Sequence, residues 1–321
     1  MPDVLLTCAG RRNYLVHCFR EALRGRGDVI AADASATAPA LHEADVAIVV
    51  PPISDPGYID AILGICQERD VGVLFSLNDL ELPLLARNRE RFAEVGTIAV
   101  VSSPEVINVC FDKLATAGFL KHHGFDSPLT YATLSSALQA VDEGVLGFPL
   151  VVKPRWGTAS IGTEYPESVE ELELVWKLGK TRLMRGLLAD ISATDQERCL
   201  LVQERVNGTE YNIDVLNDLE GRHVKTFVKR KLASRIGEGA VDAVTVEHPR
   251  LEEFGRALGE TLGHVGLLDC DVFVDGESVN VVDLNPRFGG SYPFIHHAGV
   301  DVPATLMAWA SGERHDPAWL D

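Results

Sequence analysis

The sequence predicts an α/β protein whose N-terminal part, residues 1–102, forms a doubly wound parallel sheet. Short runs of valine, isoleucine and alanine alternate there with helical stretches, which is typical of parallel sheets with helices between the strands. Changes of pattern divide the remainder into two further units, 103–190 and 191–321. The strands expected in the first unit are residues 4–8, 29–32, 46–50, 73–75 and 98–101.

The composition is that of an ordinary globular protein with a strongly acidic balance. Hydrophobic residues make up 46% of the 321 residues and charged residues 24%, which argues against a disordered chain. The net charge of −18 argues against a nucleic-acid partner, because such binding needs a basic surface. No apolar run reaches the ~18 residues that span a bilayer, and the start of the chain resembles a core strand rather than a signal peptide. Six scattered cysteines without a CxxC pair favour a reducing cytoplasm.

Polar residues follow several strands of the first unit. Gly10 comes after the first strand, but the rest of a GxGxxG fingerprint is absent, so a dinucleotide site has little support. Asp33 follows the second strand, and Asn78, Asp79 and Glu81 follow the fourth. Ligands in open α/β sheets bind beyond the carboxyl ends of strands, which makes these residues candidate substrate contacts. Capping of the next helices is an equally good explanation.

The second unit contains two lysines and a glycine-bearing loop. Ser103 begins one helix, and a second helix, starting near Asp112, carries Lys113. A strand over 148–153 ends at Lys153. The loop after it offers three positions for contact with phosphate, Gly157, Ser160 and Gly162. A long cation and a glycine loop bring ammonium and backbone N–H groups close to phosphate oxygens. A surface turn at Lys153 and a snorkelling Lys113 are the alternatives.

The third unit opens with a buried strand, residues 199–206. Backbone groups around Gln203, Glu204 and Val206 could meet an adenine edge, and the Glu210 carboxylate could accept hydrogen bonds from ribose. Taken alone, the pattern favours an ordinary hairpin with polar outer residues. The other elements expected are a polar helix at 167–188, an exposed link at 189–198, strands at 210–216 and 223–228, and helices at 250–263 and 302–310.

The most informative stretch is a predicted hairpin around an Asp-Gly turn. A loop centred on Glu277 places Asp271 opposite Asp283, and strand alternation puts Asn285 on the same face as Asp283. Facing carboxylates are unfavourable unless a positive charge lies between them. Hard oxygen ligands on one rigid surface suit Mg²⁺, which takes its other ligands from water and phosphates. Arg287 would be a fixed cation beside that metal. A solvated hairpin with incidental acids is the alternative.

In chain order these features are Lys113, the strand with Lys153 and the glycine loop, Gln203-Glu204 with Glu210, and Asp271 with Asp283-x-Asn285-x-Arg287. In this order and spacing the chain resembles the ATP-grasp superfamily. It looks closest to the branch that includes the large subunit of carbamoyl phosphate synthase and its short stand-alone relatives. The resemblance covers nearly the whole chain. It implies a pre-ATP-grasp domain followed by two α+β subdomains that clamp ATP.

The resemblance also implies roles for the nucleotide-contacting residues. Lys113 and Lys153 would contact the ATP phosphates. Glu204 and Val206 would hold the adenine, and Glu210 would bind the ribose.

The resemblance makes Asp271, Asp283 and Asn285 the ligands of one or two Mg²⁺ ions, with Mn²⁺ as an alternative. Arg287 would steady the phosphoryl group in transfer. Both hairpin acids are Asp, where Glu or Gln is commoner in the family, so the number of ions is left open.

One basic cluster, residues 227–238, stands out in this acidic chain. We expect Arg230 and Arg235 to bind the substrate carboxylate or its acyl phosphate, because the guanidinium fork matches the geometry of such groups. A solvated loop is the alternative.

The resemblance implies an ATP-dependent carboxylate–amine ligase. Such an enzyme activates a carboxylate as an acyl phosphate, which an amine attacks to give an amide. We expect small-molecule or amino-acid substrates, a cytoplasmic location, no membrane or nucleic-acid partner and, from the family, a homodimer. The alternatives are a carboxyphosphate- or carbamate-forming enzyme of the carbamoyl phosphate synthase type, or an ATP-binding regulatory protein without turnover.

Overall fold

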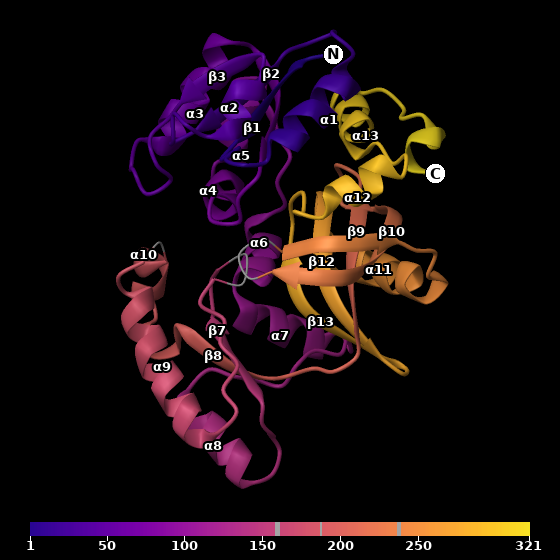
Figure 1. Ribbon diagram of the computed structural model, residues 1–321. Helices are drawn as coiled ribbons and strands as arrows, with labels where there is room; N and C mark the ends of the chain where they lie inside the picture. The colour runs from indigo at the N-terminus through magenta and orange to yellow at the C-terminus, as the bar shows by residue number, and fades with distance from the viewer. Residues whose placement is uncertain (158–160, 187, 236–238) are drawn as a thin grey trace.

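The computed structural model describes residues 1–157, 161–186, 188–235 and 239–321. The N-terminal domain, at the top of Figure 1, is a parallel sheet in the order β3-β2-β1-β4-β5. Its strands are β1 (Asp3–Thr7), β2 (Val29–Asp33), β3 (Val46–Val49), β4 (Val71–Ser76) and β5 (Ile98–Ala99). Its helices are α1 (Asn13–Leu23), α2 (Pro39–Glu43), α3 (Tyr58–Glu68), α4 (Leu82–Arg87) and α5 (Arg89–Glu94). The predicted doubly wound domain is confirmed.

Both faces of this sheet are buried, as in other parallel sheets. Leu6 of β1 packs in a core with Phe19 of α1, whereas the adjacent Leu5 packs with Ile62 of α3 on the other face. The C-terminal helices α12 (Tyr292–His297) and α13 (Val302–Ala310) join the core on the α1 side. Figure 1 shows α13 beside α1, so the end of the chain returns to the first domain.

The middle unit is an antiparallel sheet in the order β6-β8-β7, covered by two helices. The elements are β6 (Thr130–Tyr131), α8 (Leu134–Asp142), β7 (Leu150–Pro154), α9 (Val169–Leu183) and β8 (Leu200–Glu204). We predicted that the third unit starts at residue 191, yet β8 pairs with β6 and β7. Sheet pairing therefore assigns β8 to the middle unit.

Most residues of the segment 189–198 are exposed, as predicted, but the segment is not a plain link. It forms α10 (Ala189–Ala193) and a 3₁₀ turn, η1 (Gln196–Arg198). Ser192 is buried, and Asp195 binds Arg155 beside β7. The polar composition of the segment hid these contacts, which reach across 40 residues of sequence.

The third unit is an antiparallel sheet in the order β11-β10-β9-β12-β13. Its elements are β9 (Thr209–Asn217), β10 (His223–Arg235), β11 (Gly239–Thr245), α11 (Pro249–Leu262), β12 (Gly266–Asp275) and β13 (Ser278–Asn285). The helix α11, together with α6 (Pro104–Phe111) and α7 (Lys113–His122), packs on one apolar face. We predicted a shorter β10 and did not predict β11. The opposite face of the sheet carries polar and charged residues.

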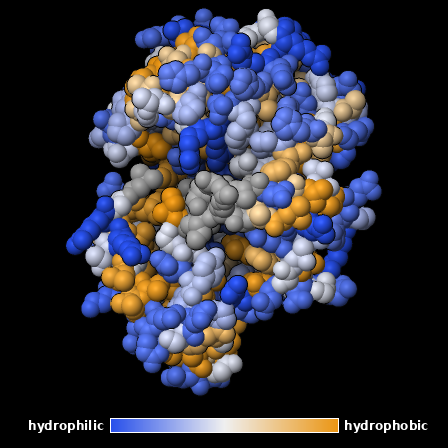
Figure 2. Space-filling model, in the orientation of Figure 1, coloured by the Kyte–Doolittle hydropathy of each residue, from blue (hydrophilic) through white to orange (hydrophobic). Residues whose placement is uncertain are grey.

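The N-terminal domain, at the top of Figure 2, has a largely hydrophilic surface in this view. No helix in the described ranges has the length and apolar character needed to cross a membrane.

Candidate nucleotide and metal site

A β-bulge brings the hairpin acids together. The turn pairs Asp275 with Ser278, a register that would leave Asp271 opposite Val282, but the register shifts by one residue and pairs Asp271 with Asp283. Val281 and Leu284 both lie in the apolar core, so the extra residue, Val282, reverses the alternation between them. Asp283 and Asn285 therefore lie on the polar face. The predicted Asp271–Asp283 pairing is confirmed.

Both predicted phosphate-binding lysines converge on β13. The ammonium of Lys113 donates to Asp283 Oδ1 at 2.7 Å and to the carbonyl oxygen of Gly157 at 3.2 Å. Lys153 is 7% exposed and donates to the carbonyl of Val282, the bulged residue, at 3.3 Å. Burial would raise the pKa of Asp283, but Lys113 and Lys153 outweigh it and lower that pKa. Two cations and a carboxylate from distant parts of the chain thus share one small volume.

An ion-pair network that the sequence did not reveal holds Lys113 in place. Arg155 follows β7 and binds Asp112, the N-cap of α7, through two hydrogen bonds of 2.7 and 2.6 Å. It also binds Asp195 at 2.9 Å. The backbone N–H of Lys113 donates to the Arg155 carbonyl at 3.1 Å, which fixes the start of α7 against the glycine loop. We identify Arg155 as a positioning residue for Lys113.

Arg155→Ala should therefore lower stability and weaken nucleotide binding together. Asp112 and Asp195 would lose a partly buried partner, which we expect to lower the free energy of unfolding by about 3 kcal/mol. Arg198→Ala is the matched control, because Arg198 binds the same Asp195 but is 54% exposed in its side chain. Urea unfolding and ADP titration check both variants. Equal effects of the two substitutions would contradict the positioning role.

Lys153 should make nucleotide binding depend on pH. Burial, and then the charge of Lys113, lower the pKa of Lys153 to about 8, while Asp283 acts in the opposite direction. Lys153 is therefore charged below that pH and loses its proton as the pH rises through it, so the affinity for ADP should fall. Lys153→Arg should keep its affinity up to about pH 9, because guanidinium stays protonated. Calorimetric titration of ADP checks this, and identical pH profiles of the two proteins would contradict it.

Lys231 on β10 links two of the predicted acids. Its ammonium lies 2.7 Å from Glu210 Oε1, the predicted ribose ligand, and 2.7 Å from Asp271 Oδ1. These two carboxylates raise the pKa of Lys231 despite its burial. The structure does not bring Arg230 to this site, because alternation along β10 turns its exposed side chain to the other face. The side chain of Arg235 lies outside the described part of the structure.

Arg287 lies between the N-terminal domain and the third sheet. Its guanidinium donates to Asp79 Oδ2 at 2.8 Å and to Asp269 Oδ2 at 3.2 Å. Burial would lower the pKa of Arg287, but these two carboxylates outweigh it and raise that pKa. The Arg12 guanidinium also donates to the carbonyl of Phe288, which ties the loop after β13 to the N-terminal domain. Asp269 was missed, although its spacing of two from Asp271 places it on the same face.

The acidic residues after the N-terminal strands fall into different environments. Asp79 joins Arg287, whereas Glu81 is fully buried. Its carboxylate accepts hydrogen bonds from Thr7, Ser76 and Tyr58 at 2.5–2.7 Å. Glu81 therefore joins strand ends instead of facing a ligand. The Asp33 carboxylate accepts a hydrogen bond from the N–H of Gly10 at 2.8 Å, and the amide oxygen of Asn78 accepts one from the N–H of Leu80 at 3.0 Å.

The predicted adenine-binding residues lie at the end of β8. Gln203 is buried and donates to the hydroxyl of Thr130 at 2.7 Å. The backbone N–H of Glu204 donates to the Leu129 carbonyl, so this donor belongs to the sheet. Val206 follows the strand and is partly exposed. Gln203 and Glu204 thus belong to the middle unit, and Val206 lies in the segment that leads from β8 to β9.

The glycine loop is described in part. Gly157 has a φ of +157° and Gly162 a φ of +75°, backbone conformations that favour glycine. Ser160 lies outside the described residues.

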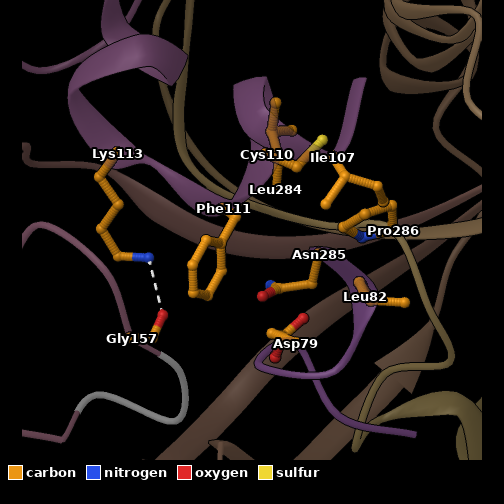
Figure 3. Close-up of a pocket in the computed structure, with 10 residues that line it drawn as sticks. All are labelled: Asp79, Leu82, Ile107, Cys110, Phe111, Lys113, Gly157, Leu284, Asn285 and Pro286. Atoms are coloured by element: carbon orange, nitrogen blue, oxygen red, sulfur yellow. Dashed lines mark hydrogen bonds between the residues drawn. The ribbon is translucent and has the colours of Figure 1, made fainter. Parts of the chain in front are cut away.

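A pocket lies between the N-terminal domain, α6 and β13. Its polar lining residues are Asp79, Lys113 and Asn285, and its apolar wall comes from α4, α6 and β13. Figure 3 shows Asp79 and Asn285 close together, with the ammonium of Lys113 hydrogen-bonded to the Gly157 carbonyl. The predicted metal ligand Asn285 and two predicted phosphate-contacting residues, Lys113 and Gly157, thus border one pocket.

The donor set fits Mg²⁺. Among the described residues, no group of three or more His, Cys, Asp or Glu is arranged to hold a metal. Asp271 and Asp283 instead face each other, with Asn285 as an amide ligand on the same face. The Asn285 nitrogen donates to the Asp269 carbonyl at 3.4 Å, which leaves its amide oxygen for a cation. Mg²⁺ commonly binds one or two carboxylates and takes further ligands from phosphates and water.

Two family models match the chain. The "PylC-like, N-terminal domain" model matches residues 4–101, and the model "ATP-grasp in the biosynthetic pathway with Ter operon" matches residues 196–319. The carbamoyl phosphate synthase large chain of Rubrobacter xylanophilus is 25% identical over 75% of this chain. That of Thermus thermophilus is 25% identical over 79% of it. The chain spans only 22% and 24% of the lengths of these two relatives.

Solved structures share the fold at low identity. The biotin carboxylase complex from Campylobacter jejuni aligns with a TM-score of 0.76 and 16% identity, over 99% of this chain and 73% of that chain. An L-amino acid ligase from Bacillus licheniformis aligns with a TM-score of 0.67 and 18% identity, over 97% of this chain and 74% of that one. The N5-carboxyaminoimidazole ribonucleotide synthetase from Thermotoga maritima gives 0.67 and 16%, over 100% and 78%. The chain therefore belongs to the ATP-grasp superfamily and is related to the carbamoyl phosphate synthase large chain.

Proposed function

We propose that this protein is an ATP-dependent carboxylate–amine ligase that forms an amide through an acyl phosphate. The observation that carries the proposal is the convergence of Lys113 and Lys153 on Asp283, which faces Asp271 and lies near Arg287. The family relationship supports the same chemistry, because the similar solved structures include an L-amino acid ligase.

In this proposal the nucleotide-contacting and metal-binding residues have different roles in phosphoryl transfer. Lys113 and Lys153 would neutralise phosphate oxygens, and Glu204, Val206 and Glu210 would hold the nucleoside. Asp271, Asp283 and Asn285 would hold one or two Mg²⁺ ions, which neutralise charge that develops on the phosphates. Such a site acts by positioning and electrostatics and needs no nucleophilic protein residue.

In this proposal Arg287 holds the group in transfer. Its Nε–H is buried and has no acceptor within the described parts of the chain, so this donor is left for a ligand oxygen. Its other nitrogens are held by Asp79 and Asp269, which keep the guanidinium in one orientation. The reacting carboxylate would therefore lie between β13 and the carboxyl end of β4. Arg235 stays a further proposal for binding that carboxylate.

Hydroxylamine trapping tests the proposal. The protein is incubated with Mg-ATP, hydroxylamine and a panel of amino acids and other carboxylic acids. A hydroxamate formed with one acid, together with ADP, would identify the acid and support acyl-phosphate formation. ATP binding without ADP under any of these conditions would contradict a ligase and favour the regulatory alternative.

Carboxyphosphate chemistry is the second candidate. The carbamoyl phosphate synthase relatives favour it, as does a similar structure, a biotin carboxylase domain described with MgADP and bicarbonate. ADP release that depends on bicarbonate alone would support this candidate over an organic acid.

The assembly and location stay predictions. Light scattering of the purified protein would test the homodimer, and cell fractionation would test the cytoplasmic location.

A further inference from the structure

Asn212 of β9 connects the proposed metal site to the proposed transfer arginine. It is 2% exposed and lies opposite Asp271 in the β9–β12 ladder. Its amide nitrogen donates to Asp271 Oδ1 at 2.8 Å and to Asp269 Oδ1 at 2.6 Å. An amide nitrogen has two N–H groups, so both are used by these two carboxylates.

The orientation of this amide is dictated by a chain of donors. Lys229 is fully buried, pairs with the equally buried Asp214 and donates to the hydroxyl oxygen of Ser291 at 2.9 Å. Because an ammonium only donates, Ser291 must use its own proton elsewhere, and its hydroxyl donates to Asn212 Oδ1 at 2.9 Å. The oxygen of Asn212 therefore faces Ser291 and its nitrogen faces the two aspartates.

The two carboxylates that Asn212 holds have different partners. Lys231 and Asn212 both reach Oδ1 of Asp271, and no donor in the described ranges reaches its Oδ2. This arrangement leaves Oδ2 of Asp271 for a cation. Asp269 receives Asn212 on Oδ1 and Arg287 on Oδ2. One amide thus sets the rotation of a proposed metal ligand and of the carboxylate that orients Arg287.

We propose that Asn212 is a positioning residue that couples the metal-binding carboxylate Asp271 to Arg287. The inference rests on the proposed function and adds to it a residue that touches neither metal nor nucleotide. Groups that orient metal ligands through hydrogen bonds commonly change metal affinity by about 10- to 100-fold when removed. Asn212→Leu keeps the approximate volume and removes both hydrogen bonds, so it should show a loss of that size.

The test measures the affinity of the protein–ADP complex for Mn²⁺ by electron paramagnetic resonance. The measurement needs no turnover. Asn212→Leu should weaken Mn²⁺ binding by about 10- to 100-fold. Ser291→Ala leaves the amide in place but removes its orienting donor, so a smaller loss, by a factor of about 3, is expected. This second variant keeps the test open if Asn212→Leu does not fold.

Asn217→Ala is the matched control, since Asn217 is a fully buried asparagine on the same strand. Its amide binds the backbone carbonyls of Gly221, Gly259 and His264, which are structural contacts. It should lower the melting temperature and leave Mn²⁺ affinity within about twofold of wild type. The inference about Asn212 would be overturned if both Asn212→Leu and Ser291→Ala kept wild-type Mn²⁺ affinity, or if Asn217→Ala lost as much Mn²⁺ affinity as they do. Either result would leave the proposed function standing. Wild-type protein that binds no Mn²⁺ with ADP would overturn the proposed function as well.

Discussion

Arg287→Ala should abolish turnover and also loosen the attachment of the N-terminal domain. An arginine that stabilises a phosphoryl group in transfer contributes about 10³-fold or more to the rate. Arg287 is 8% exposed and neutralises Asp79 on the N-terminal domain and Asp269 on the third sheet. Removing it would leave two carboxylates without this buried partner, at a cost of about 3–5 kcal/mol.

Arg287→Lys separates the two effects. It keeps the positive charge, so most of the stability should return, but a lysine cannot bind both carboxylates and a ligand oxygen in the fixed geometry of a guanidinium. ADP release under saturating Mg-ATP and chemical unfolding are measured for both variants. An Arg287→Ala protein with wild-type turnover would remove Arg287 from the site.

Asp283→Asn should abolish ATP turnover with little change in the fold. The substitution keeps the shape of the side chain but removes the charge that pairs with Lys113 at 2.7 Å and faces Asp271 across the hairpin. A rate loss of about 10²-fold or more is expected, because the metal would lose a charged ligand and two lysines would lose their shared anion.

Asp275→Asn is the control on the same hairpin, since Asp275 lies at the exposed turn. It should keep wild-type turnover and stability. ADP release at several Mg²⁺ concentrations compares the two variants. If Asp283→Asn keeps its activity at the Mg²⁺ concentration that saturates wild type, the hairpin does not hold the metal.

The sequence predicted those parts of the site that depend on local pattern. The doubly wound N-terminal sheet follows from alternating apolar strands and helices. The Asp-Gly turn predicts the hairpin, but the Asp271–Asp283 pairing also requires the bulge at Val282. The bulge at Val282 could not be predicted from alternation, yet it is what turns Asp283 and Asn285 to the polar face. Its physical basis is a single extra residue, which reverses every later side chain in the strand.

The residues that were missed depend on contacts between distant segments. The Asp112–Arg155–Asp195 network joins residues about 40 positions apart, and nothing in the local sequence signals it. Arg230 was preferred to Lys229 and Lys231 because a guanidinium can bind a carboxylate through two hydrogen bonds. The strand was expected to end at residue 228, so no face was assigned to the cluster. Once β10 extends to Arg235, alternation with the core residue Val228 places both lysines on the polar face.

Oxygen transfer tests the central claim most directly. The acid identified by hydroxamate formation is prepared with ¹⁸O in its carboxylate and converted with Mg-ATP and an amine. An acyl-phosphate route transfers one carboxylate oxygen to the released phosphate, and the ³¹P resonance of that phosphate should show the isotope shift. Phosphate without ¹⁸O, released together with ADP, would contradict the account, because ATP would then be hydrolysed without activation of the carboxylate.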